Sequence, residues 1–134
     1  MKNEAKNNTE LCPCGSGQTF DHCCQPYLQQ RHNPVTAETL MRSRYTAFVL
    51  NDEEYLRYSW HPHTCPEDIG LDTKTRWLGL QIKATQQGQA HDDSGRVTFV
   101  ARFKIKGKAF RLCENSLFTR LGKRWVYFDG EIIK

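Results

Sequence analysis

The sequence lacks any apolar run close to the roughly 20 residues that span a bilayer, which excludes a helical membrane protein. Its first residues, MKNEAKNNTEL, are polar and contain no apolar core of a secretory signal peptide. We therefore expect a soluble, cytoplasmic protein with no membrane partner. In that reducing compartment, the six cysteines are better explained as metal ligands or buried residues than as disulfides.

The sequence also lacks the short patterns that mark several enzyme classes. It contains no phosphate-binding loop, no dinucleotide-binding glycine fingerprint, no His-Glu metal motif and no Ser-His-Asp order. Internal repeats and low-complexity tracts are absent as well, so the 134 residues fit one compact domain with at most a small appendage. An enzymatic activity is neither predicted nor excluded by these absences.

The pattern of the sequence changes at Pro34. Before it, residues 11–33 carry four of the six cysteines and show no apolar periodicity. After it, apolar residues at helical spacing predict a helix that begins at Thr36 and ends near Val49, and acidic residues from Asp52 begin a second, shorter helix. We place the boundary between a polar tail with a cysteine module, residues 1–33, and a folded domain, residues 34–134.

Beyond residue 74 the apolar period becomes two, which is typical of half-buried strands. Gly107-Lys108 and Gly122-Lys123 have the composition of tight turns between strands. Helices followed by an antiparallel meander indicate an α+β domain. The predicted strands cover residues 77–85, 96–106, 109–120 and 124–129.

The strongest motif is CPCGSGQTFDHCC at residues 12–24, in which eight residues separate Cys12 and Cys14 from Cys23 and Cys24. Four thiolates can enclose a zinc ion tetrahedrally at Zn–S distances of about 2.3 Å, and soft sulfur ligands favour zinc over magnesium or calcium. A complete set of four sulfurs leaves no open position, so we expect one structural Zn²⁺. Two alternatives stay open, namely His22 in place of a cysteine and crossed disulfides in an oxidising compartment.

This spacing resembles the SEC-C motif, the zinc module of the SecA translocation ATPase and of many other bacterial proteins. In that family the last position is Cys or His, and the four positions that bind zinc match the four clustered cysteines one for one. The sequence GSGQTFDHCC is also similar to the family's G-S-G-x-x-[FY]-x-x-C-C. The resemblance implies that Phe20 is the packing residue of the module.

Further segments extend the resemblance to the YchJ family of bacterial proteins. They are PYL at 26–28, LMRSRYTAF at 40–48, WHP at 60–62, TRWLGL at 75–80, ENSLF at 114–118 and WVYFDG at 125–130. The resemblance implies that residues 34–134 form an α+β cone like that of nuclear transport factor 2, with helices packed on a curved antiparallel sheet. We use "the cone" for these residues below.

Cones of this kind often enclose a pocket, and the third predicted strand places Glu114 and Ser116 within an otherwise apolar face. A buried carboxylate beside Arg or His could act as a general base or anchor a ligand. The alternative is that Glu114 pairs with Arg42 or Arg44 and fixes helix to sheet, because a buried charge must be paired. The candidate pocket residues are Arg42, Arg44, Tyr45, His61, Trp77, Glu114, Ser116, Trp125, Tyr127 and Asp129, although the tryptophans also suit a core.

Two functions follow from these signals. The sequence favours the first, an adaptor whose zinc module docks on a protein or ribosome-like partner, as the SecA module does with the chaperone SecB and with ribosomes. The second is a small-molecule enzyme or ligand-binder that uses the cone pocket, and it rests on fold analogy. Residues 102–124 also hold eight basic residues against Glu114 alone, which indicates either a nucleic-acid contact or an ordinary solvated face.

Overall fold

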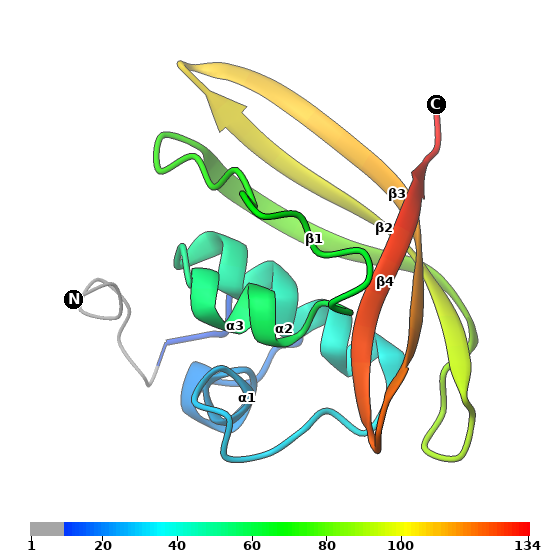
Figure 1. The fold of residues 1–134 in the computed structure, drawn as a ribbon. Coiled ribbons are helices and arrows are strands. Elements are labelled where there is room, and N and C mark those ends of the chain that lie inside the picture. The colour runs from blue at the N-terminus through cyan, green and yellow to red at the C-terminus, as the bar shows by residue number, and fades with distance from the viewer. Residues whose placement is uncertain (1–9) are drawn as a thin grey trace.

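The four predicted strands form one antiparallel sheet in the order β1-β2-β3-β4. The structure is a computed structural model that describes residues 10–134, so most of the expected polar tail lies outside the described residues. The sheet curls around the helices, with the β2–β3 hairpin projecting past one end (Figure 1). The strands are β1 (Arg76–Gln87), β2 (Ser94–Ile105), β3 (Lys108–Leu121) and β4 (Arg124–Ile132).

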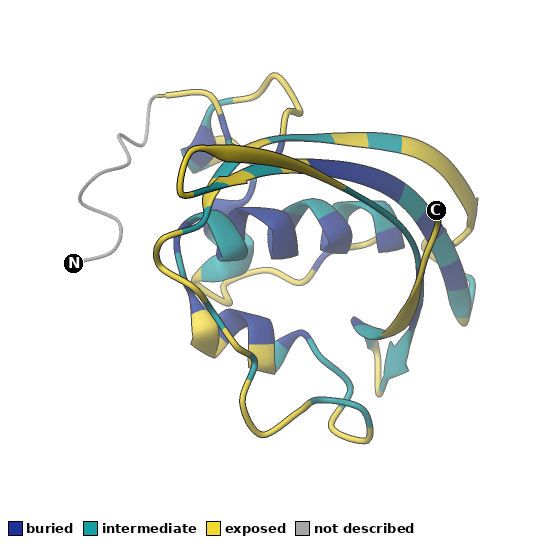
Figure 2. Ribbon diagram, turned by 90° about the horizontal axis from the view of Figure 1, so that it is seen from above, coloured by how far each residue is buried: buried dark blue, intermediate teal, exposed yellow. Residues whose placement is uncertain are grey.

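Both predicted helices are present and begin where their caps indicate. Thr36 accepts a hydrogen bond from the backbone N–H of Thr39 at the start of α2 (Ala37–Val49). Asp52 does the same for the N–H of Tyr55 at the start of α3 (Glu53–Tyr58). Each cap satisfies a backbone donor that the first turn leaves free. The resulting α2 lies along the concave side of the sheet (Figure 2).

The cysteine segment contains two short helical pieces that its sequence pattern did not predict. They are η1 (Phe20–His22) and α1 (Gln25–Leu28). Neither is long enough to show an apolar period, which needs several turns. Their position is instead set by packing, because Phe20 is buried in the same core as Leu40 and Met41 of α2. The module and the cone therefore share one hydrophobic core.

The turn between β2 and β3 is one residue earlier than its composition indicated. Ile105 pairs with Lys108, so Lys106 and Gly107 form the turn instead of Gly107 and Lys108. Both turn residues have positive φ, 52° and 79°, as a type I′ hairpin requires. The glycine thus takes the second central position. The predicted turn at Gly122 and Lys123 is confirmed by the pairing of Leu121 with Arg124.

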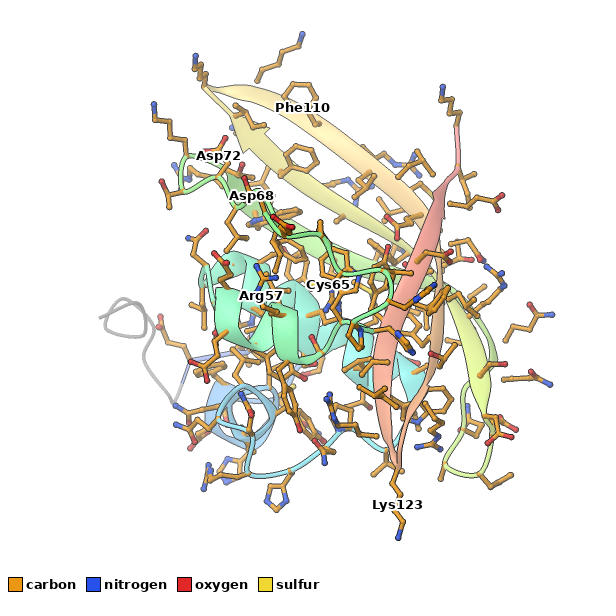
Figure 3. All side chains as sticks on the ribbon, in the orientation of Figure 1. Arg57, Cys65, Asp68, Asp72, Phe110 and Lys123 are labelled. Atoms are coloured by element: carbon orange, nitrogen blue, oxygen red, sulfur yellow. The ribbon has the colours of Figure 1, made fainter. Side chains whose placement is uncertain are left out.

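Two of the eight basic residues of segment 102–124 hold loops in place. Arg120 donates to the carbonyls of Ala90, Asp92 and Lys123 and lies 4.1 Å from the Trp125 ring centroid. Arg124 donates to the Tyr58 carbonyl and lies over its ring. The other side chains alternate along the exposed hairpin or, like Lys123, point away from the sheet (Figure 3). This arrangement fits a solvated face, and a nucleic-acid contact stays a prediction.

Between α3 and β1 the chain runs as a long loop that Arg57 fastens. Its guanidinium donates to the carbonyls of Pro66 and Glu67 and pairs with Glu53 one helical turn earlier. Figure 3 shows Arg57 of α3 near Cys65 of this loop, and their Nη1 and Sγ atoms are 3.7 Å apart. Among residues 10–134 no helix is long and apolar enough to cross a membrane.

Candidate metal centre and cone pocket

The four clustered cysteines come together at one point. Their Sγ atoms all lie within 4.8 Å of one another, and those of Cys14 and Cys23 are 3.5 Å apart. A tetrahedron of sulfurs about 2.3 Å from a zinc ion has edges of about 3.8 Å. All four cysteines are free rather than disulfide-bonded. The sulfur positions therefore fit a tetrahedral metal ion, as the spacing predicted.

His22 is not a member of this cluster. Its exposed ring contacts the Thr19 hydroxyl and the Asp21 carboxylate through Nδ1, at 3.2 and 3.1 Å. Its position in η1 turns the side chain away from the sulfurs, so the donor set that could hold a metal consists of four cysteines.

The sulfurs change one another's acidity. Contacts with Cys12 and then Cys24 hold the pKa of Cys14 far below its ordinary value. The Cys24 sulfur, and more weakly the Ser16 hydroxyl, lower the pKa of Cys23 to about 7 against the opposing effect of burial. The pKa values of Cys12 and Cys24 are raised in return, because one thiolate disfavours the next. Without a cation, the cluster therefore favours thiolates at Cys14 and Cys23 and thiols at Cys12 and Cys24.

Helix α2 supports the metal centre from one side. The buried Thr46 hydroxyl donates to the Cys24 sulfur at 3.3 Å and lies 3.6 Å from the Cys12 sulfur. From the same helix, Arg42 donates to the Cys14 carbonyl at 2.8 Å and pairs with Glu38. Hydrogen bonds to a ligand's own atoms fix its orientation toward the metal. The cysteine cluster is therefore held in place by the module and the cone together.

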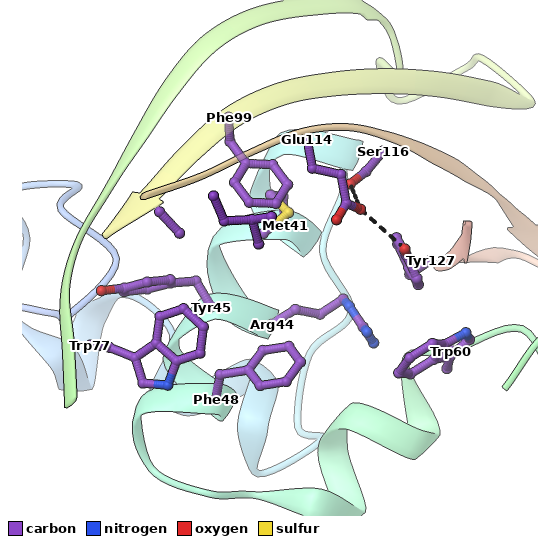
Figure 4. A pocket seen from close by; sticks show the side chains of 12 residues that line it. Met41, Arg44, Tyr45, Phe48, Trp60, Trp77, Phe99, Glu114, Ser116 and Tyr127 are labelled. Atoms are coloured by element: carbon purple, nitrogen blue, oxygen red, sulfur yellow. Dashed lines mark hydrogen bonds between the residues drawn. The ribbon is translucent and has the colours of Figure 1, made fainter. Parts of the chain in front are cut away.

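The second feature is a cavity of about 280 Å³ inside the cone. It lies between α2 and the sheet, next to the loop that starts at Trp60 (Figure 4). Apolar and aromatic side chains make most of its wall, and Arg44, Glu114 and Ser116 contribute polar groups. The full lining is Met41, Arg44, Tyr45, Phe48, Trp60, Trp77, Phe99, Ala101, Leu112, Glu114, Ser116 and Tyr127.

Arg44 is a buried cation without an acidic partner among residues 10–134. Its Nη1 donates to the Leu56 carbonyl at 2.9 Å and to the Ser59 hydroxyl at 2.7 Å. The guanidinium carbon lies 4.8 Å from the centroid of Trp60 and 4.7 Å from that of Tyr127. Burial lowers the pKa of Arg44 to about 10, and it remains charged at neutral pH. The two aromatic faces supply part of the missing counter-charge.

Glu114 is half-buried and hydrogen-bonded, as predicted, but its partners are not arginines. Its Oε2 accepts from the Ser116 hydroxyl at 2.7 Å and from the Tyr127 hydroxyl at 3.1 Å. The expected pairing with Arg42 or Arg44 is therefore wrong within the described chain. Burial, and next the carboxylate of Glu114, raise the pKa of Tyr127 above its ordinary value.

Six of the ten residues predicted for the pocket line it, and four lie elsewhere. Arg42 faces the cysteine cluster, whereas Arg44 faces the cavity. Residues two positions apart on an α-helix point in directions that differ by roughly 200°. Trp125 is core and donates its indole N–H to the Val35 carbonyl. His61 lies against Phe128 outside the cavity, with its backbone N–H bound to the Tyr127 carbonyl.

Asp129 is displaced by a bulge in β4. Tyr127 pairs with Phe118, whereas Asp129 pairs with Leu117, the neighbour one residue away on β3. A register shift of one residue moves a side chain to the opposite face of a sheet. Asp129 is therefore exposed while Tyr127 lines the cavity. A strict alternation along the strand cannot reveal such a shift.

Sequence reasoning missed half of the cavity wall. The missed residues are apolar or aromatic and belong to the same periodic patterns that mark a core: Met41, Phe48, Trp60, Phe99, Ala101 and Leu112. No sequence signal separates a side chain that fills a core from one that borders an empty space, since both are apolar and inward-facing. The segments LMRSRYTAF at 40–48 and WHP at 60–62, which the resemblance singled out, contain Met41, Phe48 and Trp60, but nothing in them indicates a cavity.

Comparison with known proteins identifies both the cone and the cysteine module. Residues 36–130 match the family described as YchJ, middle NTF2-like domain, and residues 9–26 match the SEC-C motif. A UPF0225 protein of Cupriavidus pinatubonensis is 47% identical over 128 residues, covering 91% of this chain and 88% of its own. Another, from Chromobacterium violaceum, is 46% identical over 129 residues, with 93% and 95% covered.

Two solved structures share the fold. The solution structure of a SEC-C motif containing protein from Rhodopseudomonas palustris has a TM-score of 0.82 and 31% identity, over 92% of this chain and 98% of that one. A crystal structure of a SEC-C motif containing protein from Psychrobacter arcticus has a TM-score of 0.74 and 27% identity, over 95% and 85%. Both matches include the module as well as the cone. This chain therefore belongs to the YchJ-like, UPF0225 family of bacterial proteins, an NTF2-like α+β cone preceded by a SEC-C motif.

Proposed function

We propose that this protein binds a small organic molecule in the cone pocket, and that its cysteine cluster holds one structural zinc ion. The observation that carries the proposal is the cavity itself: about 280 Å³ of space walled mostly by apolar and aromatic side chains, with a buried arginine that forms no ion pair among the described residues. Ligand sites are typically concave and mostly apolar, with a few convergent polar groups. A well-packed core would hold neither the space nor the unpaired charge.

A structural rather than catalytic role for the metal follows from its donor set. Four sulfur ligands complete a tetrahedron and leave no position for a substrate or a water molecule. Three of the four cysteines are also buried. Zinc is favoured because it is the ion that four thiolates most often hold in this geometry. Metal analysis of protein purified without chelator tests this, and we expect about one zinc per chain.

The adaptor role expected from the SEC-C resemblance stays a prediction. Because the module packs against α2, the proposed zinc ion could also serve to fix the module to the cone, without any outside partner. Ligand binding and docking on a partner are separable, because the first needs the cavity and the second needs the outer surface of residues 10–33. A variant that fills the cavity therefore discriminates between them.

The experiment uses the metal-loaded chain and a library of small metabolites, screened by ligand-observed NMR. Ala101 is buried at the cavity wall, so Ala101→Leu places three extra carbons in the space that a ligand would occupy. Ala109→Leu, at an exposed position of the same hairpin, is the matched control. We expect compounds that bind the natural chain to lose binding in the first variant and keep it in the second. A library without a single binder, or binders indifferent to Ala101→Leu, would refute the proposal.

A further inference from the structure

Arg44 has an unused hydrogen-bonding edge. A guanidinium carries five N–H donors, and both donors of Nη1 are taken by Leu56 and Ser59. Within residues 10–134, no acceptor meets Nε–H or the two donors of Nη2. These two nitrogens form the side of the fork that binds a carboxylate with two parallel hydrogen bonds. The free edge belongs to a side chain that lines the cavity.

The rest of the wall holds Arg44 still. Its guanidinium carbon lies 4.8 and 4.7 Å from the neighbouring rings of Trp60 and Tyr127, and its Nη1 is anchored at the C-terminal end of α3. An arginine fixed in this way gives up little side-chain entropy when a ligand arrives. Figure 4 shows the side chain extending into the space between Phe48, Trp60 and Glu114. The cation is thus prepared for a partner that the chain does not supply.

Glu114 offers a complementary group from β3. Its Oε2 is occupied by Ser116 and Tyr127, and no donor among the described residues reaches Oε1. The Glu114 carboxyl group occupies the space beside Gly130 of β4, where the Cβ of any other residue would overlap it. A ligand near Glu114 would therefore be favoured if it brought a hydrogen-bond donor, and disfavoured if it brought a second negative charge.

We propose that the ligand is a small organic acid with a hydrogen-bond donor, such as a hydroxyl, at its other end. Its carboxylate meets the Nε and Nη2 edge of Arg44, its donor meets Glu114, and its apolar body lies against Phe48, Trp77 and Phe99. This inference rests on the proposed function and names the chemical class that the pocket selects. A cavity of about 280 Å³ suits a molecule below drug size.

The test compares matched probes on the metal-loaded natural chain by NMR titration, following the indole N–H and arginine Nε–H signals. The probes are the three hydroxybenzoate isomers, unsubstituted benzoate and the corresponding hydroxybenzamides. We expect at least one hydroxybenzoate to bind roughly ten- to hundredfold more tightly than its amide, because the amide lacks the charge that Arg44 pairs with. We also expect benzoate to bind more weakly than that isomer.

Three variants separate a role in binding from a role in folding. Arg44→Lys keeps the charge but loses the two-pronged edge, and it should weaken the acids while leaving the amides unchanged. Glu114→Gln removes the neighbouring negative charge, and it should strengthen benzoate. Ser59→Ala removes one anchor of Nη1 without touching the free edge, so it serves as the control for altered packing.

Each outcome decides between the two proposals. Amides that bind as tightly as the acids would overturn the ligand class while leaving a ligand-binding pocket intact. If Arg44→Lys weakens acids and amides equally, Arg44 is a structural residue and the inference is wrong. If Arg44→Lys does not fold, the comparison of acid with amide on the natural chain and the Glu114→Gln variant still decide. Probes of every class that fail to bind, together with an empty library screen, would overturn both.

Discussion

We expect the cysteine module and the cone to unfold in one cooperative transition, because Phe20 of the module is buried in the core of the cone. Phe20 is 1% exposed and belongs to the same core cluster as Leu40, Val97 and Trp125. Replacing a buried phenylalanine by alanine costs about 3–5 kcal/mol, since it removes apolar contacts and leaves a cavity. For a chain of this size that loss corresponds to a melting temperature about 10–20 °C lower.

The assay is thermal unfolding of the metal-loaded protein, followed by tryptophan fluorescence, which reports on the cone. We expect Phe20→Ala to lower the midpoint of one cooperative transition. Phe110→Ala is the matched control, because Phe110 is 40% exposed and its loss should cost less than about 1 kcal/mol. If the tryptophan transition is unchanged in Phe20→Ala, the cone folds independently from residue 34 onward and the shared core contributes nothing to stability.

Three further predictions concern the metal centre and the pocket. Thr46→Val should weaken metal affinity about 10–100-fold, measured by competition with a chelator, whereas Thr119→Val, which removes a buried hydroxyl with no partner, should not. Metal removal should lower the midpoint of the whole transition, and a cone that melts as before would contradict this. Gly130→Ala should cost about 1–3 kcal/mol in urea unfolding by displacing Glu114, while Gly79→Ala, which meets open space, should stay close to the natural chain.

Structural features that depend on residues close in the sequence could be predicted from it. The caps at Thr36 and Asp52 and the period of two beyond residue 74 depend on near neighbours, and the helices and strands appear where they indicate. Cysteine spacing is similarly local, because four ligands within 13 residues can reach one ion with little help.

Features that depend on contacts between residues far apart in the sequence could not be predicted from it. The bulge that exposes Asp129 leaves no mark in the sequence. The placement of Arg42 and Arg44 on different sides of α2, in contrast, follows from the predicted helix, because residues two positions apart on a helix point in directions roughly 200° apart. The predicted partners of Glu114 were wrong because Tyr127 reaches it only once β3 and β4 pair. An empty cavity is harder still to predict from sequence, because the residues of its wall have the same composition as those of a filled core.

The order of the elements along the chain has a consequence for synthesis on the ribosome. Every sulfur of the metal centre, and the α2 residues that support it, lie in the first 50 residues, whereas Tyr127 at the pocket belongs to the last strand. A nascent chain can therefore bring together the proposed metal ligands while the sheet is still being translated. The strands then add one after another, each beside its predecessor, so every new hairpin closes on a template that already exists. The proposed zinc ion would act at the beginning of this process, and the proposed ligand only at its end.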